Sequence, residues 1–141
     1  MSHKSKLKAD FLEAQHTILQ IGRLNGVTLV APASFWLAAP GRRQNVCNGC
    51  GPGGWKWDIV PDTMYGLSVR DACDIHDWMY CHGKTVLDKD NADKVFKANL
   101  YQIIEKKTSF WPLKILRRIR ACWYYLAVSW LGHAAFWKGK Q

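Results

Sequence analysis

The stretch DACDIHDWMYCHG, residues 71–83, decides how we read the rest of this chain. If it is helical, Cys73, His76 and Tyr80 lie on one face, because residues three and four apart are neighbours on a helix. Asp77 follows His76 and is turned about 100° from it, since a helix has roughly 3.6 residues per turn. We therefore predict a helix over 71–82. The imidazole of His76 and the carboxylate of Asp77 would point in different directions and could have different tasks.

A second helix is predicted over 91–107, with Asp90 as its N-cap. Because Gly83 ends the first helix and the connection is short, the two helices should pack antiparallel. His76 and Asp93 then lie at similar distances from the turn, so that their side chains could meet. The apolar residues of the second helix recur on one face, as a core-facing helix requires: Ala92, Val95, Phe96, Leu100, Ile103 and Ile104.

Upstream of this pair lies a glycine-rich loop, CNGCGPGG, at 47–54. Four glycines and a proline in eight residues exclude regular structure. Such a loop can present backbone carbonyls or amides to an ion. The other interpretation is a simple turn.

The N-terminal part predicts an amphipathic helix from Lys4 to Arg23, stopped by Gly26. We expect this helix to cover the core, although its basic end could touch lipid headgroups. The apolar stretch Val27–Pro40 has fourteen residues and is too short to cross a bilayer. It is either a packed loop or a lipid-facing surface patch. The patch would have Phe35 and Trp36 at its tip. The predicted helix from Lys4 to Arg23 has its apolar residues at helical spacing: Leu7, Phe11, Ala14, Ile18 and Ile21.

The C-terminal part, 109–141, is basic first and then apolar and aromatic. The segment 121–137 has no Asp, Glu, Lys or Arg in seventeen residues. That length is at the bottom of the range for a membrane-spanning helix, which needs roughly 20 residues. Three interpretations stay open: a helix in the membrane interface, a helix packed on the core, and a true span.

Composition indicates a folded domain with an anionic partner. The chain has 141 residues, 48% hydrophobic and 22% charged, with a net charge of +9. Nucleic acid and an acidic membrane face are both compatible with that charge. Eight Trp residues favour the membrane, because Trp suits the interface between lipid and water. We divide the chain into an N-terminal helix and loop (1–46), a core (47–108) and a C-terminal helical segment (109–141).

The motifs CGPGG at 50–54 and DxCxxHDxxY at 71–80 resemble the signature of the phospholipase A2 family. The segment ADKVF at 92–96 resembles the second-helix segment that carries the family's catalytic aspartate. The resemblance covers roughly 47–100. It implies a mostly α fold, in which two antiparallel core helices carry the His/Asp site. A glycine-rich calcium loop lies against them, and further helices flank them at both ends of the chain.

For function, the resemblance implies calcium-dependent hydrolysis of the sn-2 ester of glycerophospholipids. His76 would be the general base and Asp93 the aspartate that orients it, with Asp90 as the substitute if the register slips. Tyr80 matches the tyrosine that supports the catalytic aspartate. Calcium prefers oxygen ligands, and the resemblance assigns it to the Asp77 carboxylate and to the carbonyls of Gly49, Gly51 and Gly53.

The resemblance also implies a disulfide between Cys50 and Cys73. Pairing Cys47 with Cys81 is a weaker analogy, and Cys122 would then stay unpaired among the five cysteines. The chain departs from the secreted animal enzymes, which have further cysteines at the positions of Ala72 and Met79 and a shorter span between 54 and 71. These departures indicate a divergent, disulfide-poor member.

Two other functions remain in view. Cys47, Cys50, Cys73 and His76 have the spacing of a structural zinc site, which would make this a small basic module that binds nucleic acid. Alternatively, the basic and aromatic C-terminal segment could disrupt membranes without catalysis. If the protein is a phospholipase, we expect its partner to be a phospholipid membrane, preferably one rich in anionic lipid. We then expect no binding to nucleic acid. The N-terminus lacks a secretory signal pattern, so we expect membrane association or non-classical secretion.

Overall fold

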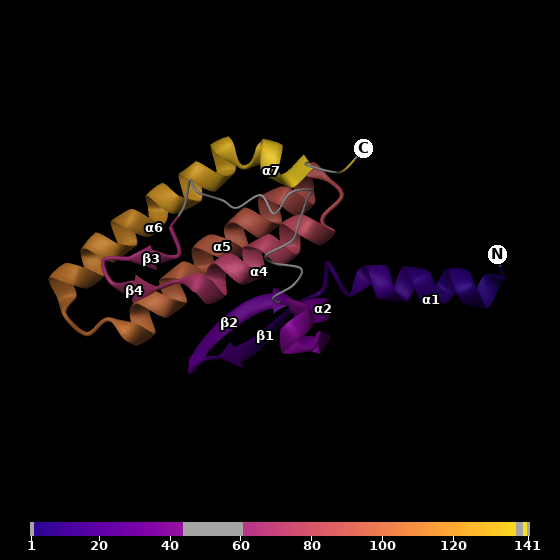
Figure 1. Cartoon of the computed structure of the whole chain (residues 1–141), viewed down its shortest axis with the longest axis horizontal. Coiled ribbons are helices and arrows are strands. Elements are labelled where there is room, and N and C mark those ends of the chain that lie inside the picture. Colours follow the sequence, from indigo (N-terminus) through magenta and orange to yellow (C-terminus); the bar gives the residue numbers. More distant parts are fainter. Residues whose placement is uncertain (1, 44–60, 138–139, 141) are drawn as a thin grey trace.

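The computed structural model describes residues 2–43, 61–137 and 140, and the protein is mostly helical, as predicted (Figure 1). Helices α4 and α5 lie side by side at the centre, α6 covers one side of them, and a two-stranded sheet lies on another. In chain order the elements are α1 (His3–Ala14), β1 (Leu19–Leu24), β2 (Val27–Pro32), α2 (Ala33–Leu37), β3 (Thr63–Met64), β4 (Leu67–Ser68), α4 (Arg70–His82), α5 (Val86–Lys107), α6 (Trp111–Leu131) and α7 (His133–Trp137).

The central pair of helices agrees with the prediction, except at the start of α5. Helix α4 ends at Gly83, and a Cβ there would lie 2.6 Å from the ring of Phe136, so only glycine fits. Asp90 was wrong as N-cap. Helix α5 begins five residues earlier than expected, because Thr85 and Asp88 form a capping box that satisfies two backbone amides. The two helices are therefore joined by a very short turn and run antiparallel (Figure 1).

The predicted helix from Lys4 to Arg23 is wrong in its second half. Helix α1 ends at Ala14, and β1 pairs antiparallel with β2. Asn25 and Gly26 turn the chain between the strands with φ values of 51° and 81°. Such positive angles at both positions suit the two-residue hairpin turn that Asn-Gly favours. Gly26 thus closes a hairpin instead of ending a helix.

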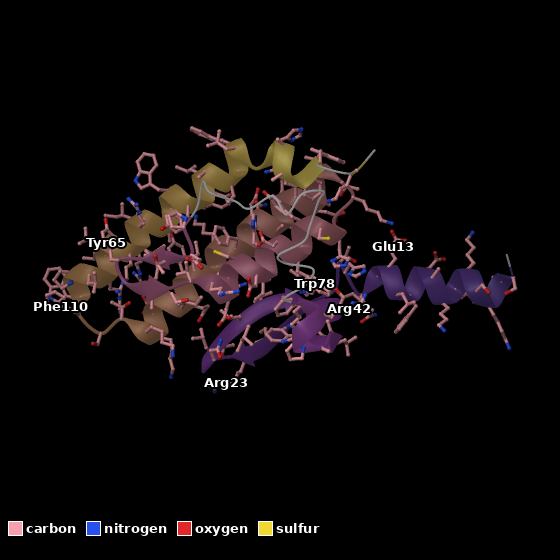
Figure 2. The ribbon with its side chains drawn as sticks, in the orientation of Figure 1. Glu13, Arg23, Arg42, Tyr65, Trp78 and Phe110 are labelled. Carbon is pink, nitrogen blue, oxygen red and sulfur yellow. The ribbon has the colours of Figure 1, made fainter. Side chains whose placement is uncertain are left out.

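Helix α1 does not cover the core, which corrects the second part of that prediction. It has no buried residue, and Leu7 and Phe11 are exposed. In Figures 1 and 2 it extends away from the rest of the protein, and its side chains contact little else. Glu13 at its C-terminal end forms an ion pair with Lys84.

The apolar stretch after the hairpin turn is packed as far as Phe35, so the surface-patch interpretation is wrong for that part. The packed-loop interpretation is right about the packing and wrong about the loop. Strand β2 and helix α2 occupy it, and Phe35 is buried edge-on against Trp78 of α4. The side chain of Asn99 on α5 donates to the carbonyl of Val30 and accepts from its amide, both at 2.8 Å. These two bonds fix β2 to α5.

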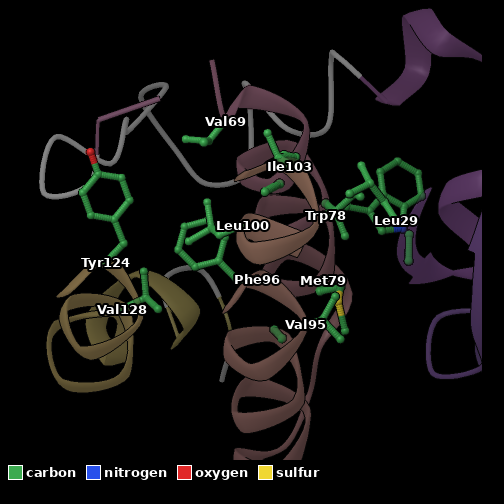
Figure 3. Close-up of a cluster of buried hydrophobic side chains, with 14 of the residues drawn as sticks. Leu29, Val69, Trp78, Met79, Val95, Phe96, Leu100, Ile103, Tyr124 and Val128 are labelled. Atoms are coloured by element: carbon green, nitrogen blue, oxygen red, sulfur yellow. The ribbon is translucent and has the colours of Figure 1, made fainter. Parts of the chain in front are cut away.

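Helix α6 packs on α5 along one face and leaves the opposite face exposed. Arg117, Ala121, Tyr124 and Val128 are buried. Figure 3 shows Phe96 and Leu100 of α5 pointing toward Tyr124 and Val128, while Trp78 faces Leu29 of β2. Of the described residues, no helix combines the length and the apolar character needed to cross a membrane.

Candidate active site

The structure brings His76 of α4 and Asp93 of α5 together, as the sequence predicted. His76 Nε2 lies 2.8 Å from Asp93 Oδ1, and the two residues are only 3% and 2% exposed. Since a carboxylate can only accept, Nε2 carries the proton and donates. The imidazole packs against the rings of Tyr80 and Phe96, with centroids 4.0 and 4.7 Å away. Asp90, the substitute for Asp93, is exposed on α5.

Tyr80 also reaches the same carboxylate. It lies one turn after His76 on α4, and its hydroxyl donates to Asp93 Oδ1 at 2.6 Å. The carboxylate oxygen therefore receives one bond from an imidazole and one from a phenol. All three residues predicted for catalysis meet in one buried cluster.

Lys89 is a fourth member of the cluster, and the sequence analysis missed it. It is 4% exposed, and its Nζ donates to Asp93 Oδ2 at 2.8 Å. The local signal for this pair is a lysine four residues before an aspartate on one helix. Burial of the lysine could not be read from that spacing, because it depends on α6, whose Val128 and Ser129 carbonyls accept from Nζ at 3.2 and 3.3 Å.

The electrostatics favour a neutral imidazole beside an ionised carboxylate. Burial lowers the pKa of His76, and the hydrogen bond to Asp93 opposes this only in part. Burial by itself would raise the pKa of Asp93, but hydrogen bonds from His76, Lys89 and Tyr80 bring it below its usual value. Burial and the bond to Asp93 raise the pKa of Tyr80, so it stays a donor. Two groups whose pKa values are set by burial and by specific partners are typical of functional sites.

Asp77, the predicted calcium ligand, lies next to His76 on α4 and is partly buried. Burial, with the nearby Asp74 carboxylate, raises the pKa of Asp77 to about 8. A carboxylate in such a place would gain from a bound cation, which fits a metal ligand. Among the described residues, no group of three or more His, Cys, Asp or Glu side chains is placed to hold a metal. The other predicted ligands, the carbonyls of Gly49, Gly51 and Gly53, lie outside the described residues.

The cysteine predictions are mostly beyond what the structure describes. Cys47 and Cys50 lie outside the described residues, so neither the predicted disulfides nor the zinc site is tested. No disulfide joins Cys73, Cys81 and Cys122 to one another. Burial and the Asp77 carboxylate raise the pKa of the Cys73 thiol strongly.

The described cluster can hold an imidazole in one tautomer and stabilise its protonated form, which is what a general base requires. Its four residues come from two adjacent helices and are buried, with the imidazole packed against the rings of Tyr80 and Phe96. Comparison with known proteins adds no relative: no protein-family model, curated protein or solved structure matches this chain.

Proposed function

We propose that this protein is a phospholipase A2-like enzyme that hydrolyses the sn-2 ester of glycerophospholipids in the presence of calcium. The observation that carries the proposal is the buried pair of His76 Nε2 and Asp93 Oδ1 at 2.8 Å, with Tyr80 on the same oxygen. These are the residues to which the sequence resemblance assigns catalysis. The choice of the sn-2 ester rests on that resemblance.

The chain's own residues suggest how the proton moves. Because Nε2 donates to Asp93, the basic lone pair of the neutral imidazole is on Nδ1. Nδ1 would take a proton from water as the water oxygen attacks the ester carbonyl. Asp93 would stabilise the resulting imidazolium. The imidazolium then returns the proton to the glycerol oxygen as the ester bond breaks, so that a fatty acid and a lysophospholipid leave.

The metal would be held by the Asp77 carboxylate and, by the resemblance, by the carbonyls of Gly49, Gly51 and Gly53. When bound, calcium supplies positive charge that stabilises the oxygen of the attacked carbonyl. Asp77 would hold the metal in its ionised form, and the charge of a bound cation would offset the burial that raises its pKa to about 8.

The exposed side of α6 supports a membrane partner. Leu116, Ile119, Trp123 and Trp130 are exposed and follow one another at intervals of three, four and seven residues, so they form one stripe, here called the α6 stripe. Its two tryptophans are 65% and 77% exposed. Exposed aromatic side chains are suited to the lipid interface. Together with a net charge of +9, they favour binding to anionic vesicles that weakens with salt.

Fatty acid release from phosphatidylglycerol vesicles tests the reaction. We expect release with calcium and none with a calcium chelator. His76→Gln should abolish release, because an amide cannot take the proton from water. His3→Gln is the matched control, since His3 is exposed on α1, and it should release fatty acid like the unchanged protein.

Two outcomes would contradict the proposal. Equal release by His76→Gln would remove His76 as the base. Leakage of vesicle contents without fatty acid release, unaffected by His76→Gln, would instead favour a membrane-disrupting protein without catalysis. Vesicle binding tests the partner separately. Replacing Trp123 and Trp130 together with Ser should weaken binding to phosphatidylglycerol vesicles, and unchanged binding would exclude the α6 stripe as the lipid contact.

A further inference from the structure

Lys89 is the one lysine among the described residues that is buried. Its ammonium has three hydrogens and lies within hydrogen-bond distance of three acceptors. These are Asp93 Oδ2 at 2.8 Å, the carbonyl of Val128 at 3.2 Å and that of Ser129 at 3.3 Å. The charge is therefore paired and each of its hydrogens has an acceptor, as a buried charge requires. The proposed hydrolysis assigns no task to it.

The contact fixes the orientation of the Asp93 carboxylate. Oδ1 is bound by His76 and Tyr80, and Oδ2 is bound by Lys89. With both oxygens bound, rotation of the carboxylate would break at least one charge-assisted bond. The position of Oδ1, and hence the tautomer of His76, therefore depends on Lys89.

The same ammonium ties the site to the end of α6. The Val128 carbonyl also accepts from the Gly132 amide at 2.9 Å and from the Tyr80 hydroxyl at 3.4 Å. Helix α6 has no basic residue in its own last turn. Lys89 places a positive charge there, where the helix dipole favours one. The last turn of α6 and the carboxylate of Asp93 are thus joined through one side chain.

We propose that Lys89 is a positioning residue, which locks Asp93 against His76 and connects this pair to the last turn of α6. The inference rests on the proposed hydrolysis, but the geometry it concerns can be tested without that reaction. Lys89 does not touch the reacting atoms. Its loss should therefore slow the chemical step and leave the affinity for the lipid surface unchanged.

The first arm measures kinetics on phosphatidylglycerol vesicles with calcium. Lys89→Met removes the charge and the three donors and keeps a side chain of similar length. Lys106→Met is the matched control, because Lys106 is exposed on the same helix and its loss changes the net charge equally. We expect kcat to fall about tenfold or more in Lys89→Met, since a small displacement of a catalytic group has a large effect on rate. KM should equal that of Lys106→Met. A kcat within twofold of the control would overturn the proposal.

The second arm does not need activity. It follows the NMR signal of the Nε2-bound proton of His76, which reports the hydrogen bond to Asp93. We expect this signal to shift or broaden in Lys89→Met and to stay unchanged in Lys106→Met. An unchanged signal in Lys89→Met would overturn the proposal. If the unchanged protein shows the signal but no hydrolysis, the proposed function fails while this arm still decides the role of Lys89.

A third variant is needed if Lys89→Met does not fold. Lys89→Gln keeps two donor hydrogens without the charge, and near-ultraviolet circular dichroism checks that its tertiary packing is retained. We expect a loss of kcat and a shift of the His76 signal in the same directions, of smaller size. A folded Lys89→Gln with the kcat and the signal of the unchanged protein would refute the positioning role.

Discussion

Replacing Lys89 and Asp93, singly and together, should separate the energy of their buried ion pair from that of its surroundings. The two side chains are 5% and 2% exposed, and their charged atoms are 2.8 Å apart. Removing one member of a buried pair leaves an uncompensated charge, at a cost of about 3–5 kcal/mol. Here Asp93 keeps two donors and Lys89 keeps two carbonyl acceptors. We therefore expect Lys89→Met and Asp93→Asn each to cost about 3 kcal/mol, the lower end of that range.

The double variant should cost clearly less than the sum of the two single variants, because no unpaired charge remains. The expected coupling energy is about 1–3 kcal/mol. Urea unfolding, followed by the fluorescence of buried Trp78 and the other tryptophans, measures all four free energies of unfolding. Lys106→Met with Asp93→Asn is the control cycle, since Lys106 is exposed. We expect no coupling in it.

Additive costs in the first cycle would refute this reasoning. They would mean that Lys89 and Asp93 do not share a desolvated site. The test concerns the buried network alone and holds whatever reaction the protein performs.

Three further predictions follow from the same site and its neighbours. Tyr80→Phe should lower the free energy of unfolding, measured by urea unfolding, by about 1.5–3 kcal/mol, because it removes a buried hydrogen bond to a charged carboxylate. An unchanged free energy of unfolding would mean that this bond contributes nothing to stability. His16 and His82 stack with ring centroids 4.1 Å apart, and burial lowers the pKa of both imidazoles below 6.5. As pH falls below about 6.5, the unfolded chain takes up protons on these two residues before the folded protein does, so the stability that the pair contributes falls. Replacing both histidines with Gln should flatten the fall in unfolding free energy between about pH 7.5 and 5.5, and an unchanged slope would contradict this. Burial raises the pKa of Asp77 to about 8, so between about pH 4 and 8 the unfolded chain releases this proton while the folded protein keeps it, and stability falls as pH rises. Asp77→Asn should therefore melt at a higher temperature than the unchanged protein at pH 8 in a chelator. It should also lose calcium binding by calorimetry.

The central helices and the site could be predicted because their signals are local. Helical spacing places His76 and Tyr80 on one face, and Gly83 ends α4 where expected. A short connection then forces α5 back along α4, which brings Asp93 to His76. No long-range information was needed for that meeting. The start of α5 differs from the prediction because Thr85 and Asp88 form a capping box that satisfies two backbone amides, whereas Asp90 has only the residue type of an N-cap.

Other parts of the fold depend on a turn signal that competes with helical spacing, or on contacts between distant segments. Ile18 and Ile21 fit a helical face as well as a strand, and the Asn25-Gly26 turn decided for the hairpin. Asn99 then holds that hairpin on α5 by bonds that span 69 residues of sequence. Burial of Lys89 likewise depends on α6, since two of its acceptors are carbonyls 39 and 40 residues away.

The most direct measurement uses phosphatidylglycerol that carries palmitate at sn-1 and oleate at sn-2. Mass spectrometry identifies the fatty acid that is released in the presence of calcium. The proposed mechanism predicts oleate and 1-palmitoyl lysophospholipid from the unchanged protein and from His3→Gln, and neither product from His76→Gln. Absence of any released fatty acid from the unchanged protein, or release of oleate by His76→Gln at an equal rate, would contradict it.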